Sequence, residues 1–266
     1  DGSRQPGGSA FYGALQAARL GARALIVTRG VAREIDALLE PFREELDVRV
    51  LPAAHTTTLL TTWTGAQRRQ RVLAWAGPIA EDLAFDTAVL HLAPVARESP
   101  RRWRGRARFV GLTPQGLARR WSDATNGEIS STAPARAQAE LARRCDALVL
   151  SEHERSFCEQ LIAGARETGA LVAVTAAERP TTILCADGRE LRVQVPAVAD
   201  AADDLGAGDV FAAAFFLALC QRSPVEAAAR FANCAAAVRV RAAGAGAIGT
   251  RAQIDARVRA SADAHG

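Results

Sequence analysis

The most informative segment of the 266-residue sequence is Asp203-Asp204-Leu205-Gly206-Ala207-Gly208-Asp209-Val210-Phe211. Small residues at its centre let a ligand approach the backbone closely, and the apolar residues after them predict a long helix that begins near Gly208. Free N–H groups at the start of a helix attract anions. The carboxylate of Asp209 lies in the same first turn and can accept a proton. One helical turn therefore combines an anion hole with a general base.

Phosphoryl transfer to an alcohol requires these two groups, because its catalysis rests mainly on positioning and on the stabilisation of charge. The structural alternative is an ordinary helix start whose glycines serve only close packing. The segment alone therefore favours a phosphotransferase without excluding a purely structural turn.

The composition excludes several other classes. All 33 basic residues are Arg, so the chain cannot be a Schiff-base enzyme, a Walker-type nucleotidase or a protein kinase, which all need Lys. A net charge of +4 with 5% aromatic residues is too weak a signal for a nucleic-acid partner. We interpret the basic cluster as a solvated surface loop; its members are Arg101, Arg102, Arg104, Arg106 and Arg108.

The cysteines and the hydropathy pattern indicate where the protein works. Five widely spaced cysteines form no zinc-site spacing with the four histidines, and unpaired thiols are typical of a reducing compartment. No run of 18 apolar residues is present, so no membrane partner is expected. These features predict a cytoplasmic protein.

Strand-like and helix-like patterns alternate along most of the chain, which predicts a single α/β domain with a mostly parallel sheet and helices on both faces. Residues 56–76 differ, because their β-branched and alternating pattern predicts a β-hairpin outside the main core. Strands are expected at 22–27, 48–51, 87–92, 108–112, 147–150, 170–174, 182–185 and 191–195. Helices are expected at 9–20, 31–46, 135–144, 152–167, 208–220 and 224–241.

The segment 206–209, followed by Phe211, resembles the C-terminal signature of the ribokinase/PfkB carbohydrate kinases, D-T-T-G-A-G-D. Residues 6–10, before a helix that stops at Gly21, resemble the other signature of that family, and residues 229–237 resemble its penultimate helix. The resemblance covers the chain in order. It implies a ribokinase-like three-layer α/β sandwich over residues 1–266, with the 56–76 hairpin as a lid. Only six residues precede Gly7, so we expect the family's first strand to be missing from this sequence.

Shorter matches resemble the myo-inositol kinase-like branch of the family. They are Gly7-Gly8-Ser9-Ala10-Phe11-Tyr12, Thr56-Thr57-Thr58, Gln67-Arg68-Arg69, Pro94-Val95-Ala96-Arg97-Glu98, and Gln115-Gly116 followed by Arg119. This likeness implies an ATP-dependent kinase that phosphorylates a hydroxyl of a small polyol or sugar, with a myo-inositol-like acceptor favoured.

The resemblance also implies roles for individual residues. Asp209 is the base that takes the proton from the acceptor, and the N–H groups of Gly206, Ala207 and Gly208 hold the transferring phosphoryl group. On the donor side, the nucleotide contacts are Ser151, Thr175 and Asn233, and Glu154 acts on Mg²⁺ through water. Asp203 matches a position near a monovalent cation such as K⁺.

The acceptor side is assigned to Gly7, Gly8, Gln115 and Arg119. The lid hairpin covers the acceptor, and its exposed edge is the surface through which a homodimer would form.

Several alternatives remain open. Other acceptors of the family are fructose, ribose, a ketodeoxysugar or a nucleoside. A nucleotide- or sugar-binding protein of this fold with little turnover is a different class, motivated by Ser151, by Asp204-Leu205 and by the loop at 176–180, where the family pattern is altered. Glu154 also fits a structural role, because acids are favoured in the first turn of a helix. A dinucleotide oxidoreductase would need G-x-G-x-x-G after the first strand, and the sequence has none there.

Overall fold

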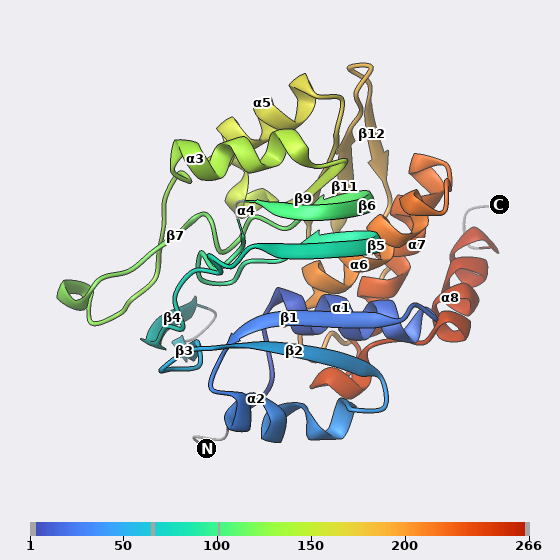
Figure 1. Cartoon of the computed structure of the whole chain (residues 1–266). Helices are drawn as coiled ribbons and strands as arrows, with labels where there is room; N and C mark the ends of the chain where they lie inside the picture. Colours follow the sequence, from blue (N-terminus) through green and yellow to red (C-terminus); the bar gives the residue numbers. More distant parts are fainter. Residues whose placement is uncertain (1–3, 65–66, 101, 264–266) are drawn as a thin grey trace.

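The computed structural model describes residues 4–64, 67–100 and 102–263 (Figure 1). Its centre is a six-stranded sheet in the order β12-β11-β10-β9-β6-β5. Four neighbours run parallel: β5 (Leu83–Leu92), β6 (Trp103–Leu112), β9 (Ala147–Ser151) and β10 (Leu171–Ala176). Two antiparallel strands, β11 (Arg179–Leu184) and β12 (Glu190–Val193), complete it. The mostly parallel sheet predicted from the alternating pattern is therefore confirmed.

A second, separate sheet consists of β1 (Ala24–Gly30) and β2 (Leu46–Pro52), which pair in parallel. β1 lies beside β5 in Figure 1, yet within the described residues no strand pairs with the facing edges of β1 and β5. Side chains join the two sheets instead, because Val27 of β1 and Phe85 of β5 pack on one small apolar cluster. The helix α1 (Ser9–Arg19) packs against β1, β2 and β5 and ties the two sheets together.

Helices cover both faces of the central sheet. One face carries α1, α6 (Ala207–Cys220), α7 (Val225–Arg239) and α8 (Arg251–Asp263). The other carries α3 (Arg136–Ala139), the 3₁₀ turn Glu140–Arg144 and α5 (Glu159–Glu167).

The strands alternate between two apolar cores. In β9, Ala147 and Val149 enter the first core, whereas Leu148 and Leu150 enter the second, as the period of two requires. α6 is apolar all round because it lies inside the first core, where Phe211, Phe215 and Phe216 are almost fully buried.

The predicted hairpin outside the core is also present. It consists of β3 (Thr58–Thr64) and β4 (Gln67–Ala74), which pair antiparallel; its expected turn at residues 65–66 lies outside the described residues. One edge of β4 is covered, since the Val72 N–H donates to Gly127 O (2.8 Å) and the Ile129 N–H donates to Gln70 O (2.9 Å). Apolar side chains of Leu60, Trp63 and Leu73 remain exposed on this hairpin.

Other elements depart from the sequence-based expectations. The helix expected at 31–46 is α2 (Ala32–Leu39), which is followed by a 3₁₀ turn that contains Pro41. The proline ring removes a backbone N–H and so disfavours continuation of the α-helix. The helix expected at 152–167 is divided into α4 (Glu152–Arg155) and α5. Two short strands that pair, β7 (Arg119–Arg120) and β8 (Ser130–Ser131), were not predicted, and neither was α8.

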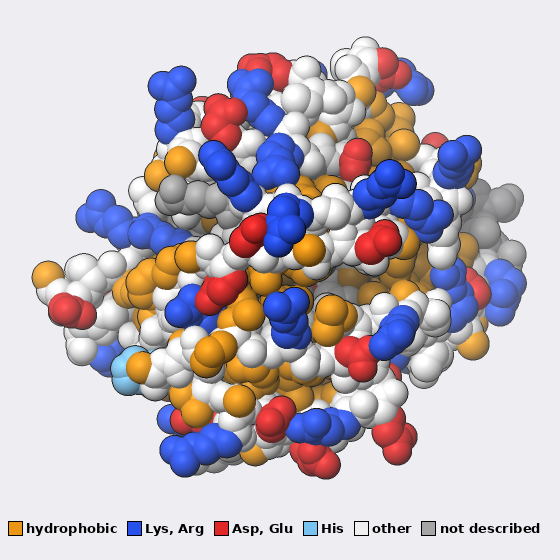
Figure 2. Space-filling model, viewed as in Figure 1, with side chains coloured by type: hydrophobic (Ala, Val, Ile, Leu, Met, Phe, Trp, Pro, Cys, Tyr) orange, Lys and Arg blue, Asp and Glu red, His pale blue; other side chains and the backbone are white. Residues whose placement is uncertain are grey.

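The basic cluster is not a loop, because β6 extends back to Trp103 and includes three of its Arg residues. Arg104, Arg106 and Arg108 are nevertheless exposed, as expected of a solvated segment, while Arg101 lies outside the described residues. On the face shown in Figure 2, acidic side chains lie among the basic ones.

The unpaired state predicted for the cysteines is seen in the structure. All five cysteines are free thiols, and four of them are buried. Among the described residues, no helix combines the length and the apolar character needed to cross a membrane.

Candidate active site

The start of α6 is shaped by Gly206, the residue that precedes the helix. Its φ of 80° lies in the left-handed region, which side chains other than glycine avoid. A Cβ atom at this position would lie 2.4 Å from Cγ of Tyr12, so glycine also permits α1 to pack closely on α6. Asp209 follows in the first turn and is half-buried. The structure thus places the predicted base and the predicted anion hole on one turn.

The three amides expected to hold the phosphoryl group have different surroundings. The Ala207 N–H donates to Asp204 O at 3.0 Å and so serves the turn itself. Gly208 is exposed, and a Cβ atom there would meet no atom within 4 Å. The open space in front of Gly208 is where a ligand can reach the backbone of this turn.

Asp203 anchors the segment that leads into this turn. One carboxylate oxygen accepts a hydrogen bond from Nη2 of Arg239 at 2.7 Å, and the other accepts the Leu205 N–H at 2.9 Å. The Gly244 N–H also donates to Asp203, at 3.3 Å. Burial alone would raise the pKa of Asp203, but these hydrogen bonds outweigh it and hold the pKa below its ordinary value.

Tyr12 completes the underside of the turn. It is buried, and the guanidinium of Arg239 lies 5.6 Å from the centre of its ring. Burial raises the pKa of Tyr12; Arg239 opposes this shift, whereas the charges of Asp203 and Asp209 add to it. Tyr12 therefore stays a neutral phenol, and the charges of both carboxylates contribute to its raised pKa.

Two predicted donor-side residues lie at neighbouring strand ends. Ser151 ends β9 and is in register with Thr175 of β10. The backbone N–H and the hydroxyl of Ser151 both donate to Oε2 of Glu154 at 2.8 Å, which caps α4. Carboxyl ends of parallel strands are the usual ligand edge of such a sheet, so this placement suits donor binding.

Glu154 is the residue expected to act on Mg²⁺ through water. Its Oε2 atom is occupied by Ser151, whereas Oε1 has no hydrogen bond among the described residues. Within the part of the chain that is described, no group of three His, Cys, Asp or Glu side chains could hold a metal alone. Mg²⁺ usually needs only one or two carboxylates together with substrate phosphates and water, so Glu154 fits the water-mediated role.

Asn233 has a different environment from the other donor-side candidates. It is buried in α7, where its amide accepts from Thr181 Oγ1 (2.8 Å) and donates to the carbonyls of Val193 (3.2 Å) and Gln194 (3.0 Å). Its polar atoms are thus used to pack α7 on β11 and β12.

The acceptor-side candidates meet around the loop after β5. A Cβ atom on Gly8 would lie 2.8 Å from Cγ2 of Val95, and the Gly116 N–H donates to Pro94 O at 3.0 Å. Gln115 lies on the turn beside Gly116, and its side chain has no hydrogen bond among the described residues. The start of α1 and the turn after β6 are thereby brought to one place, and Gln115 is available to a ligand.

Arg119 is used inside the protein. It is buried, and its guanidinium donates to Val95 O and to Oε1 of Gln70 on the lid strand β4, both at 2.9 Å. Trp75, at the end of the lid, donates its indole N–H to Ala96 O at 2.7 Å. These bonds attach the lid to the acceptor-side loop. Arg119 therefore fixes the β3–β4 hairpin to the loop at 94–98.

The loop that Arg119 binds is held by a half-buried carboxylate, that of Glu98. Glu98 accepts the backbone N–H groups of Val95, at 2.9 Å, and of Ala96. Burial raises the pKa of Glu98, and the backbone hydrogen bonds and the charge of Arg119 offset part of that rise.

Two residues near the site were missed by sequence reasoning, namely Tyr12 and Arg239. In the sequence, Tyr12 stands out only as the last residue of the segment 7–12 that resembles the myo-inositol kinase-like branch. Arg239 carried one usable signal, because it is a charged residue between Val238 and Val240 that follows the apolar run at 234–238.

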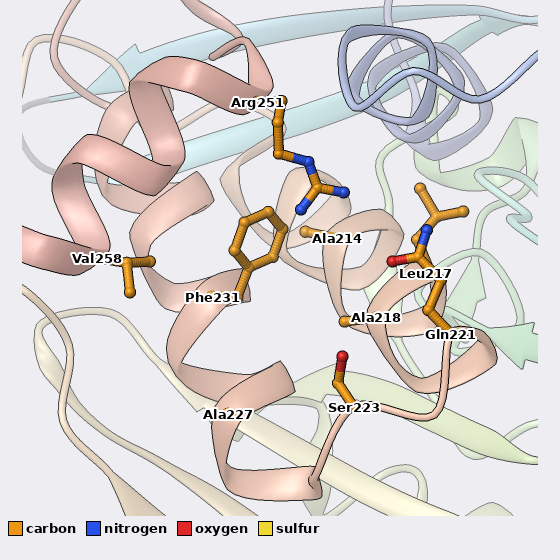
Figure 3. A pocket seen from close by; sticks show the side chains of 9 residues that line it. All are labelled: Ala214, Leu217, Ala218, Gln221, Ser223, Ala227, Phe231, Arg251 and Val258. Atoms are coloured by element: carbon orange, nitrogen blue, oxygen red, sulfur yellow. The ribbon is translucent and has the colours of Figure 1, made fainter.

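A separate hollow lies between α6, α7 and α8, away from the first turn of α6 (Figure 3). Its volume is about 230 Å³, and it is lined by Phe231, Arg251 and the second half of α6. None of the predicted site residues lines it, and its volume is below the usual range for ligand pockets. We therefore place the candidate site at the start of α6.

Comparisons with known proteins identify the family of the chain. Residues 112–251, which include the Gly206–Asp209 turn, match the family described as "pfkB family carbohydrate kinase". No match is found among curated proteins.

Several solved structures share the fold. A pyrophosphate-dependent myo-inositol-1 kinase, converted into a myo-inositol-3 kinase by mutation, has a TM-score of 0.73 at 18% identity, over 98% of this chain and 94% of that one. Ribokinase from Arabidopsis thaliana, complexed with ribose and ATP, has a TM-score of 0.72 at 18% identity, over 96% and 88%. A ribokinase II-like structure from E. coli, with ATP and Mg²⁺, has a TM-score of 0.69 at 18% identity, over 97% and 90%. The expected ribokinase-like fold is confirmed.

Proposed function

Because the chain belongs to the pfkB family of carbohydrate kinases, we propose that it transfers the γ-phosphoryl group of ATP to a hydroxyl of a small polyol or sugar, with a myo-inositol-like acceptor favoured. The observation that carries this proposal is the first turn of α6, where Asp209 and the open backbone at Gly208 lie together. A carboxylate beside an anion-binding helix start supplies what phosphoryl transfer to an alcohol needs.

The first turn of α6 performs the transfer. Asp209 accepts the proton of the acceptor hydroxyl as its oxygen forms the new bond to phosphorus, and ADP leaves with the electrons of the broken bond. The amides at Gly206 and Gly208 and the positive end of α6 stabilise the charge that develops on the phosphoryl oxygens. Mg²⁺, when bound, neutralises phosphate charge, and Glu154 would hold it through water.

The lid and the acceptor-side loops prepare the substrate. Gln115 and the start of α1 at Gly7-Gly8 are offered to the acceptor hydroxyls. The hairpin β3–β4, fixed to the loop 94–98 through Arg119 and Trp75, covers the acceptor and excludes water that would otherwise hydrolyse ATP.

The test is ADP release with Mg²⁺-ATP and a panel of acceptors: myo-inositol, fructose, ribose, 2-keto-3-deoxygluconate and adenosine. Asp209→Asn should lower kcat by several orders of magnitude, because the base is lost. Asp204→Asn is the matched control, since it removes an exposed carboxylate from the same segment and should leave kcat within about twofold. Equal turnover by Asp209→Asn and the wild type would rule out Asp209 as the base.

A second candidate donor is pyrophosphate. The nucleotide contact expected from Asn233 is occupied by three internal hydrogen bonds, and Arg179 in the loop at 176–180 pairs with Glu152 of α4. Both features leave fewer polar side-chain atoms for contact with a nucleoside. Neither involves the proposed phosphate-binding turn at Gly206–Gly208. Phosphorylation of the acceptor with pyrophosphate, at a kcat/KM above that with ATP, would favour this donor; phosphorylation with ATP alone would exclude it.

We also propose that the protein is cytoplasmic and pairs through its lid. The five free thiols fit a reducing compartment. Because β4 is covered by residues 126–129, the β3 edge with Leu60 and Trp63 is the side available to a second copy. Light scattering of the wild type and of Trp63→Glu tests this, and two monomeric proteins would contradict it.

A further inference from the structure

Arg239 is a fully buried cation beneath the anion-binding turn. It ends α7, and its side chain has no exposed surface. Its Nη2 atom donates to a carboxylate oxygen of Asp203 at 2.7 Å, and its Nη1 atom donates to Asp203 O at 3.3 Å and to Ala242 O at 3.0 Å. A carboxylate and two carbonyls thus converge on one positive charge.

Core stability does not account for this residue. A buried ion pair recovers its desolvation cost only with full pairing, and well-packed apolar side chains often stabilise such a place as well or better. Here the pairing is incomplete, because Nε of Arg239 is buried without a hydrogen bond and Asp203 is partly exposed. Packing does not require the costly buried charge of Arg239, which points to a role in shaping the Gly206–Gly208 turn.

The position of Arg239 specifies that role. Asp203 lies three residues before Gly206, and its carboxylate and carbonyl are the groups that Arg239 binds. The same carboxylate accepts the amides of Leu205 and Gly244, so the approach to the turn and the loop after α7 are both fixed by it. The guanidinium also lies 5.6 Å from the centre of the aromatic ring of Tyr12, which packs on Gly206.

The same oxygen atoms are what a monovalent cation near Asp203 would require. Potassium is bound by carbonyl and carboxylate oxygens, and the oxygens of Asp203 and Ala242 already surround the guanidinium. A second cation beside Arg239 would be repelled at close range in a poorly screened site. The residues present therefore do not fit the monovalent cation expected near Asp203.

We infer that Arg239 is a permanent, covalently attached substitute for a monovalent cation, which holds the Asp203 segment so that the Gly206–Gly208 turn is preformed without K⁺. This inference rests on the proposed phosphoryl transfer. Arg239 touches neither acceptor nor donor and is a positioning residue. Its charge is covalently attached and cannot dissociate into solution, so the turn is set independently of the salt composition.

The test compares the wild type, Arg239→Ala and Arg241→Ala in KCl, NaCl and tetramethylammonium chloride at equal ionic strength. Arg241→Ala is the matched control, because it removes an exposed Arg two residues away. The wild type and Arg241→Ala should show the same kcat in all three salts within about twofold. Arg239→Ala should lose at least about tenfold in kcat in tetramethylammonium chloride, with little change in the KM of the acceptor. Added guanidinium at tens of millimolar, or K⁺, should restore most of that loss.

Thermal unfolding provides a readout that does not depend on turnover. The Tm of the wild type should be the same in the three salts, and the Tm of Arg239→Ala should rise with guanidinium or K⁺ and not with tetramethylammonium. If no acceptor is phosphorylated, the proposed function fails while these Tm comparisons still decide the role of Arg239. If Arg239→Ala does not fold, Arg239→Lys replaces it, and its kcat and Tm should lie below those of the wild type and rise with guanidinium.

Three results would overturn the inference. The first is activation or thermal stabilisation of the wild type by K⁺ over tetramethylammonium. The second is a folded Arg239→Ala with wild-type kcat and Tm in tetramethylammonium chloride. The third is a folded variant whose loss no cation restores, which would mean that Arg239 serves packing alone.

Discussion

Substitution of Gly208 by Ala separates binding of the phosphoryl group from the stability of the fold. Gly208 is exposed inside the first turn of α6, and a Cβ atom would meet no protein atom within 4 Å. Alanine should therefore stabilise the fold by about 0.5–1 kcal/mol, because glycine has the poorer helix propensity. For a domain of this size that corresponds to a rise in Tm of about 1–4 °C.

The same methyl group would occupy the space in front of the helix start, where the phosphoryl oxygens are proposed to lie. We expect kcat to fall on the order of a hundredfold, the size of effect seen when one donor of an anion hole is lost. The variant should therefore be more stable and less active than the wild type. Differential scanning calorimetry and initial-rate kinetics on the same preparation measure both quantities.

Gly206→Ala provides the contrast two residues earlier. Its φ of 80° and the 2.4 Å approach to the Tyr12 ring predict strain and overpacking, which together cost about 2–6 kcal/mol. A Gly208→Ala variant with full activity would show that the phosphoryl group does not lie at this turn. A Gly206→Ala variant as stable as the wild type would refute the account of the turn itself.

Three further results are expected. The ring of His91 packs against Gly13 and Phe216, and burial lowers its pKa from 6.5 to about 4, so the folded state resists protonation more than the unfolded state does. The stability that neutral His91 contributes is fully present above pH 6.5 and is lost as the pH falls toward 4. Urea titrations should therefore show a free energy of unfolding about 2 kcal/mol lower at pH 5 than at pH 8, and His91→Gln should remove this pH dependence. Asn233→Ala should cost about 3 kcal/mol in urea unfolding, because its buried partners lose their hydrogen bonds, with an unchanged KM for the donor; a raised donor KM at unchanged stability would instead indicate nucleotide contact. Arg119→Met should detach the lid from the acceptor-side loop and raise the ratio of ATP hydrolysis to acceptor phosphorylation at least about fivefold; an unchanged ratio would contradict the lid-positioning role.

The sequence was most informative where local chemistry and the long-range fold require the same residue. Gly206 is needed for a left-handed turn and for contact with Tyr12, and Asp209 is placed by its position on the helix alone. These residues could therefore be proposed as site residues from the sequence alone. The lid was predictable for a similar reason, since its β-branched and alternating residues do not match a buried parallel strand.

What could not be predicted depends on contacts between distant residues. The role of Arg239 depends on Asp203, 36 residues earlier, and an Arg at the end of a helix does not reveal its partner. Arg119 is expected on the acceptor side from its sequence match, but its hydrogen bond to Gln70 of β4, 49 residues earlier, could not be predicted. α8 was missed because its segment is largely polar, and Ile254 is its only fully buried residue among those described.

The separation of β1–β2 from the central sheet has a consequence for cooperativity. Since no described strand bridges β1 and β5, the outer pair is attached by side-chain packing alone, through α1, the first apolar core and a small apolar cluster. It should open as its own unit in hydrogen exchange, before β9 and β10. α1 begins at the acceptor-side glycines and carries Tyr12 beneath Gly206. Local unfolding at the edge of the molecule would therefore reach the catalytic turn through one helix, and the lifetime of the active geometry would be limited by its least stable pair of strands.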